Sequence, residues 1–111
     1  MVKSVHQIKQ GDILLVGLDP TIGREIKKTR PCLVVSPDEV HNYLKTYIVV
    51  PMTTKSKPFP TRINSNSGGK EGCFALDQIK TIDSERIIKV LGKVDGRTLT
   101  KIKNCLVEMF S

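Results

Sequence analysis

The sequence contains few cysteines and few aromatic residues, which stabilise many small proteins. Its 111 residues include three cysteines, no tryptophan and 5% aromatic residues. The cysteines, Cys32, Cys73 and Cys105, are odd in number and lack CxxC spacing, which argues against a disulfide framework and a zinc site. Each lies in an apolar stretch, so we expect small core residues. A chain of this length can bury enough apolar surface to fold without disulfides or a bound metal ion.

Histidine is also scarce, and the usual catalytic motifs are missing. His6 and His41 stand apart in the sequence, with no P-loop, GxSxG or HExxH motif. A metal enzyme is therefore disfavoured, and no cofactor is expected. We expect each histidine to be exposed or to cap a helix.

Long apolar runs are absent as well. No segment approaches the roughly 18 apolar residues of a membrane span, and the start, Met1–Gln10, lacks the apolar region of a signal peptide. We therefore expect a cytoplasmic protein with no membrane partner.

Acidic residues are outnumbered by basic ones, 11 against 18, which gives a net charge of +7. The hydrophobic fraction of 39% is too high for a disordered chain, and the length fits one domain over residues 1–111. The excess charge favours an anionic partner, although it also keeps a small domain soluble. Composition alone leaves these two interpretations open.

Short apolar runs separated by turn residues predict a chain made mostly of strands. Strands are expected at 12–18, 30–36, 47–52, 59–64, 73–76, 79–82 and 87–94. Short helical turns are expected near 37–42 and 83–86, and loops at 19–29, 53–58 and 64–69.

Only the last segment, residues 96–110, has a helical period. Leu99, Ile102, Leu106 and Met109 recur on one face, and Asp95 or Thr98 is available as the N-cap. Many short strands followed by one amphipathic helix predict a mainly β fold. We expect a small antiparallel β-barrel or rolled sheet with a packed C-terminal helix.

Two basic clusters fall on predicted loops or strand ends. The first sets Arg24, Lys27, Lys28 and Arg30 against Glu25. The second holds Lys55, Lys57 and Arg62 with no acid among them. If their strands are neighbours, the clusters would line a groove able to follow a phosphate backbone; otherwise they are solvated loop tips. Phe59, beside the second cluster, is a candidate for base stacking or for the core.

Several segments in register carry a family resemblance. They are Gly11-Asp12-Ile13, Leu18–Glu25, Thr29–Ser36, Val50–Lys57 and Leu76–Asp83, followed by the amphipathic helix. Together they cover nearly the whole chain, and the chain resembles the MazF/PemK (Kid)-type toxins of bacterial toxin–antitoxin pairs. The resemblance implies an SH3-like or CcdB-like β-barrel with a terminal helix. It also implies a homodimeric, metal-independent endoribonuclease that cuts single-stranded mRNA at a short sequence and is silenced by an acidic antitoxin.

The resemblance also implies site residues. Arg30 and Thr53 match the family's catalytic arginine and threonine, while Glu25 and Asp77 match two acids of the family. Contacts with RNA are expected for Arg24, Lys27, Lys28, Thr54, Lys55, Ser56, Lys57, Phe59 and Gln78. The PemK/Kid branch has a histidine before the loop glutamate and an arginine two residues before the aspartate. This chain has Arg24 and Ala75 there.

The residue types suggest roles in RNA cleavage, in which the 2′-OH attacks the adjacent phosphorus. Arg30 is suited to hold phosphate oxygens, since a guanidinium is a poor base. Thr53 can donate to the same oxygens, Glu25 is the more ordinary base, and Asp77 acts there or orients Arg30. Structural alternatives remain: an ion pair of Arg30 with either acid, and a Thr53 hydroxyl that satisfies local backbone.

Two other functions stay open from the sequence. One is a non-catalytic CcdB-like toxin that binds a protein target such as gyrase. The other is an SH3-like module that binds nucleic acid without cutting it.

Overall fold

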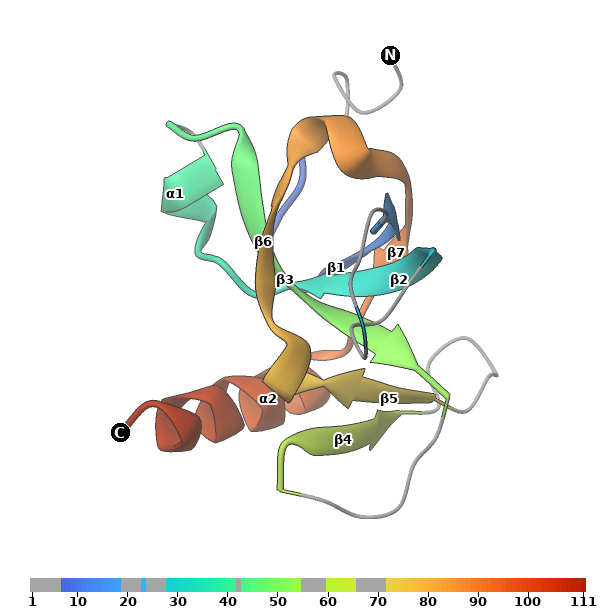
Figure 1. Ribbon diagram of the computed structural model, residues 1–111. Helices are drawn as coiled ribbons and strands as arrows, with labels where there is room; N and C mark the ends of the chain where they lie inside the picture. Colours follow the sequence, from blue (N-terminus) through green and yellow to red (C-terminus); the bar gives the residue numbers. More distant parts are fainter. Residues whose placement is uncertain (1–6, 19–22, 24–27, 42, 55–59, 66–71) are drawn as a thin grey trace.

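A computed structural model describes residues 7–18, 23, 28–41, 43–54, 60–65 and 72–111. In this part of the chain, seven strands form one sheet and a long helix packs against it (Figure 1). The strands are β1 (Asp12–Gly17), β2 (Thr29–Val34), β3 (Thr46–Thr53), β4 (Arg62–Ser65), β5 (Gly72–Ala75), β6 (Lys80–Asp83) and β7 (Ile87–Lys93). The helices are α1 (Asp38–His41) and α2 (Gly96–Met109), and 3-10 turns cover Leu76–Gln78 and Ser84–Arg86.

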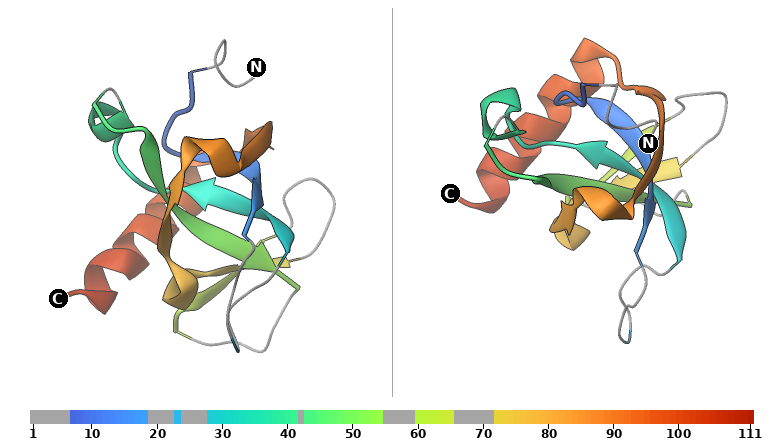
Figure 2. Two further views of the ribbon diagram at one scale, coloured as in Figure 1. Left: turned by 45° about the horizontal axis from the view of Figure 1, so that its top comes forward. Right: turned by 90° about the horizontal axis from the view of Figure 1, so that it is seen from above.

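All strand pairs are antiparallel, in the order β4-β5-β3-β2-β1-β7 with β6 also paired to β3. The central strand is β3, because Val49 pairs with Val34 of β2 on one edge and with Lys80 of β6 on the other. The same strand pairs with β5 through Met52 and Thr53. Seen from two further sides, the sheet is curled rather than flat (Figure 2). The expected mainly β fold with a C-terminal helix is confirmed.

The predicted elements match the observed ones with small shifts. The strand expected at 59–64 begins only at Arg62, because Pro60 and Thr61 precede it in a turn, and Phe59 lies outside the described residues. The two segments expected at 73–76 and 79–82 are separate strands joined by the turn Leu76–Gln78. The short helical turns are present as α1 and Ser84–Arg86.

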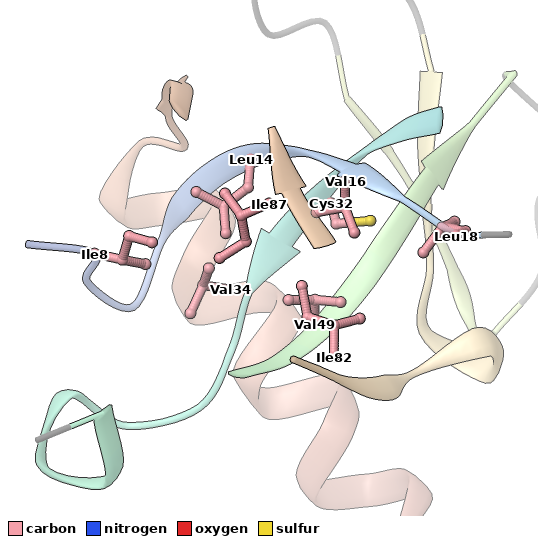
Figure 3. Close-up of a cluster of buried hydrophobic side chains, with 9 residues drawn as sticks. All are labelled: Ile8, Leu14, Val16, Leu18, Cys32, Val34, Val49, Ile82 and Ile87. Carbon is pink, nitrogen blue, oxygen red and sulfur yellow. The ribbon is translucent and has the colours of Figure 1, made fainter. Parts of the chain in front are cut away.

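The sheet buries apolar side chains on both faces. One face holds a cluster closed over by β6 and β7 (Figure 3), made of Ile8, Leu14, Val16, Leu18, Cys32, Val34, Val49, Ile82 and Ile87. The other face packs on α2 and holds Ile13, Leu33, Val50, Ile63, Phe74, Leu76, Val94 and Ile102. Alternation along β2 explains the division: Cys32 and Val34 face the first cluster, whereas Leu33 faces the second. Cys32 and Cys73 are buried and Cys105 is half-buried, as expected for core cysteines.

Asp95 is the N-cap of helix α2. Its carboxylate accepts from the Thr98 backbone N–H at 3.3 Å and from the Thr98 hydroxyl at 2.6 Å. The hydrogen bonds from Thr98 lower the pKa of Asp95, because they favour the ionised carboxylate. Ile102 is fully buried at the centre of the apolar stripe. The predicted amphipathic helix is thus confirmed.

The expectation of an exposed or capping His41 is wrong. The side chain is only 6% exposed, and its ring lies 4.6 Å from that of Tyr47. Its Nε2 is 2.6 Å from the Ser36 hydroxyl, and its Nδ1 is 3.3 Å from the Ile8 carbonyl. Because the Ile8 carbonyl can only accept, Nδ1 donates to it, and in the neutral ring Nε2 then accepts from the Ser36 hydroxyl, whose oxygen accepts in turn from the Ile48 N–H. The histidine is buried because these partners satisfy both ring nitrogens; His6 lies outside the described residues.

Candidate functional site

Arg30 stands at the start of β2, opposite Val16 of β1. Its side chain is half-buried, and the guanidinium Nε is buried without a hydrogen-bond partner among the described residues. A buried donor left unpaired costs about 1–3 kcal/mol, so the Nε is expected to have an acceptor outside the described residues.

Thr53 ends β3 at the same end of the sheet. Cys32 of β2 pairs with Pro51 of β3 in the last pair of this ladder, and Arg30 and Thr53 each lie two residues beyond that pair on their own strands. Residues two apart on a strand share one face of the sheet, so Arg30 lies on the face of Cys32 and Thr53 on the face of Pro51. Beyond the ladder, Arg30 is paired with β1 and Thr53 with β5. The two residues predicted to be catalytic therefore stand on neighbouring strands at one end of the sheet.

Thr53 is held from the other side by β5. Thr53 pairs with Cys73, whose thiol donates to the Thr54 carbonyl at 3.4 Å. The neighbouring Gly72 is buried, and a Cβ placed on it would meet the Thr53 carbonyl oxygen at 3.0 Å. A side chain at position 72 would therefore push these two backbones apart by a few tenths of an ångström.

Asp77 lies in the 3-10 turn after β5 and is engaged by a different arginine. Its carboxylate accepts from Arg62 Nε at 2.6 Å and Arg62 Nη2 at 3.0 Å, and from the Thr61 hydroxyl at 3.0 Å. The hydrogen bond from Arg62 is the main cause that lowers the pKa of Asp77 to about 2. Among the described residues, the Asp77 side chain is bonded to Arg62 and Thr61 rather than to Arg30.

Sequence reasoning missed this pair, because Arg62 counted there only as part of a basic cluster. Fifteen residues separate Arg62 from Asp77 along the chain, and only the β4–β5 pairing sets them side by side, with Arg62 opposite Ala75. A register for the β4–β5 hairpin would have been the signal needed to find it.

Three further predicted contact residues are described. Lys28 is exposed with a φ of 66°, its carbonyl accepting from the Leu18 N–H at 2.9 Å. Thr54 is exposed just after β3, and Gln78 is half-buried in the turn that holds Asp77. Arg24, Glu25, Lys27, Lys55, Ser56, Lys57 and Phe59 lie outside the described residues.

Lys80, which the sequence did not single out, also faces this region. It opens β6 opposite Val49, two residues before the buried Ile82, and is itself half-buried. Alternation along β6 sets Lys80 on the same face as Ile82, which belongs to the cluster that contains Cys32. A strand register would have been needed to find it.

Neither a metal site nor a membrane span is found among the described residues. They hold no group of three or more histidines, cysteines or acids placed to bind a metal ion. No helix in that part of the chain combines the length and apolar character that crossing a membrane demands.

Comparison with known proteins identifies the family. Residues 9–110 match the family model described as the PemK-like, MazF-like toxin of type II toxin–antitoxin systems. The chain is 30% identical over 105 residues to endoribonuclease EndoA of Bacillus subtilis, covering 89% of this chain and 90% of that protein. It is 36% identical over 72 residues to the endoribonuclease toxin MazF of Escherichia coli, covering 65% of each.

Solved structures agree on the fold. The MazF crystal structure from Deinococcus radiodurans superposes with a TM-score of 0.83 at 20% identity, covering 95% of this chain and 97% of that one. A mycobacterial endoribonuclease in complex with its cognate antitoxin gives 0.78 at 22% identity, covering 93% and 94%. The sequence match spans nearly the full chain and the structural match confirms its fold, so this protein is a member of the PemK-like, MazF-like toxins of type II toxin–antitoxin systems.

Proposed function

We propose that this protein is a sequence-specific, metal-independent endoribonuclease that cuts single-stranded mRNA and so inhibits translation. The observation that carries the proposal is the Arg30 Nε, which is buried without a partner in the described part of the chain, on the strand next to the one that ends at Thr53. Arg30 and Thr53 are the two positions that match the family's catalytic pair. The names of its relatives as endoribonucleases support the reaction class. Such activity on mRNA belongs in the cytoplasm.

RNA carries its own nucleophile, which explains how so small a site can suffice. The 2′-OH attacks the adjacent phosphorus and the 5′ oxygen leaves, giving a 2′,3′-cyclic phosphate and a 5′-OH end. The protein has to take up the 2′-OH proton, stabilise the additional negative charge and return a proton to the leaving oxygen. Neither a metal ion nor a covalent intermediate is required.

Arg30 and Thr53 supply the charge stabilisation in this mechanism. The guanidinium fork of Arg30 donates to two phosphate oxygens, and the Thr53 hydroxyl donates to the same group from the neighbouring strand. Both side chains stand on paired strands rather than on loops, so their geometry is set before RNA binds. Glu25, by its match to the family's loop acid, takes up the 2′-OH proton.

Asp77 has a supporting role in this proposal. A carboxylate with a pKa of about 2 is a weak base, and both of its oxygens already accept hydrogen bonds from Arg62. Asp77 therefore fixes the turn that carries Gln78, one of the residues proposed to contact RNA.

The partners follow from charge and family. An acidic, disordered antitoxin segment that folds on binding would cover the basic site. In support, the mycobacterial relative has been solved in complex with its cognate antitoxin. A homodimer is proposed on the family match, and the edge strand β7 exposes Ile88 and Leu91, which are 53% and 46% accessible.

The test is cleavage of a long single-stranded RNA by pure protein in EDTA, with cut sites mapped by primer extension. We expect a few specific cuts, 2′,3′-cyclic phosphate ends, and loss of all cuts in Arg30→Ala. Arg97→Ala, an exposed arginine on α2, is the matched control and keeps full activity. Cleavage that appears only on addition of a divalent metal would overturn the mechanism.

The CcdB-like alternative is tested in the same experiment. An Arg30→Ala/Thr53→Ala variant that no longer cuts RNA should also lose toxicity in cells. Retained toxicity would mean that the protein acts by binding another protein. Intact RNA bound by the wild-type protein in a salt-dependent way would instead indicate a simple nucleic-acid-binding module.

A further inference from the structure

Lys80 occupies a row of side chains that crosses three strands on one face of the sheet. It pairs with Val49 of β3, which pairs in turn with Val34 of β2. The next row on this face, two residues along β2 and β3, is Cys32 and Pro51, and Arg30 follows two residues further along β2. Lys80 and Arg30 thus lie on opposite sides of Cys32 on the same face.

The charge at Lys80 reaches this thiol. Burial raises the pKa of Cys32 to about 12, and the Lys80 ammonium acts in the opposite direction by favouring the thiolate. Cys32 stays a neutral thiol at neutral pH and cannot balance the lysine. The positive charge of Lys80 therefore acts on the face of the sheet that carries Cys32.

The acids that flank Lys80 along the described chain are engaged elsewhere. Asp77, in the turn before β6, has its carboxylate bonded twice to the Arg62 guanidinium. Asp83, at the other end of β6, caps the 3-10 turn that follows it. Neither Lys80 nor Arg30 takes part in an ion pair with another described residue. Both cations are therefore without an acidic partner among the described residues, and each is able to bind an anion.

We propose that Lys80 is a second phosphate-binding residue, whose ammonium holds a backbone phosphate of the RNA beside the one held by Arg30. The inference rests on the proposed function and extends it, since it adds to the site a residue on β6. A lysine suits this task because its ammonium is a point charge that holds a phosphate without fixing its orientation, whereas the reacting phosphate needs the fork of Arg30.

The experiment measures binding rather than cleavage. The RNA segment that the wild-type protein cuts is made with 2′-O-methyl groups, which block the nucleophile, and its affinity is measured by fluorescence anisotropy over a range of KCl concentrations. Each lost phosphate contact lowers the slope of log K against log salt by about 0.7 for a single strand. We expect Lys80→Met to reduce the magnitude of this slope by about 0.7 and the affinity at low salt roughly tenfold.

Matched variants separate charge from fold. Lys101→Met removes an exposed lysine on α2 and should leave the slope unchanged. Lys80→Arg keeps the charge and should retain the wild-type slope, and Lys80→Gln gives a second neutral variant if Lys80→Met folds poorly. Thermal unfolding of every variant without RNA checks the fold.

The outcomes are distinct. If wild-type protein binds and cuts RNA but Lys80→Met and Lys80→Gln bind with the slope of Lys101→Met, Lys80 does not hold a phosphate and this inference fails alone. If wild-type protein neither cuts nor binds the RNA, the proposed function fails and the inference fails with it. The inference is supported if the slope of log K against log salt is reduced in both neutral variants and equals the wild-type slope in Lys80→Arg.

Discussion

Arg30 and Arg62 are both half-buried arginines on strands of the same sheet, yet their surroundings differ. Arg62 donates to both oxygens of Asp77, and this bond raises its pKa. Arg30 has a buried Nε with no partner in the described part of the chain. A satisfied arginine ties β4 to the turn after β5 and serves the fold. An arginine whose Nε no described residue pairs is a candidate to bind a ligand, so this difference distinguishes the candidate functional cation from the structural one without reference to any relative.

Changing each arginine to lysine is the most direct test of whether Arg30 and Arg62 have different roles. Arg30→Lys keeps the charge but loses the fork that holds two phosphate oxygens, so kcat should fall about 100-fold with stability little changed. Arg62→Lys, the matched control, should keep activity within about threefold. Single-turnover cleavage of the mapped RNA measures both; equal losses in the two variants would contradict the distinction.

Gly72→Ala tests whether the backbone of β5 positions the site. The new Cβ would meet the Thr53 carbonyl oxygen at 3.0 Å, and backbone cannot give way as a flexible side chain does. We expect kcat to fall roughly tenfold while RNA affinity changes less, since the displaced group acts on the reacting phosphate. Gly96→Ala, where a Cβ would meet no atom within 4 Å, is the control and should keep full activity. Unchanged kcat in Gly72→Ala would show that Thr53 tolerates the shift.

Asp77→Asn tests the structural role of the ion pair between Arg62 and Asp77. The change removes an ion pair whose partners are 23% and 33% exposed, so water already screens part of it. We expect the free energy of unfolding to drop by about 1 kcal/mol, with cleavage within about fivefold of wild type. Urea denaturation and cleavage assays measure the two quantities. A 100-fold loss of cleavage with normal stability would make Asp77 a catalytic acid or base after all.

The pH dependence of this pair gives the smallest effect. Folding lowers the pKa of Asp77 from 3.8 to about 2, so the native state favours the ionised carboxylate. The stability that this shift provides is present above about pH 4 and is lost as the pH falls from about 4 to about 2. The difference in melting temperature between wild type and Asp77→Asn should therefore narrow over that interval; a constant difference would mean that the pair contributes no pH-dependent stability.

Local patterns in the sequence predicted most of the fold. Alternating apolar runs marked the strands, and the spacing of Leu99, Ile102 and Leu106 marked α2, because both signals depend on residues close in the chain. The partners of each strand were not predictable in this way. The Arg62–Asp77 pair, the facing of Lys80 and the burial of His41 all depend on registers between distant segments.

The candidate site was predicted in part and for a different reason. Arg30, Thr53 and Asp77 were named through the family resemblance, and neither composition nor spacing distinguished Arg30 from the other basic residues around it. Its distinctive property is a buried Nε that no described residue pairs, which exists only in the folded chain. The same holds for Gly72, because the atom that a Cβ would meet, the Thr53 carbonyl oxygen, belongs to a segment far away in the sequence.

The central position of β3 has a consequence for how the protein can be switched off. This strand shares hydrogen bonds with β2, β5 and β6, so its amides should exchange with solvent only through global opening. Thr53, at the end of β3, is paired with β5 alone, so partial unfolding of the β4–β5 edge would release it while the centre of β3 stayed in place. A partner that opened this edge would therefore displace Thr53 in a chain that stays otherwise folded.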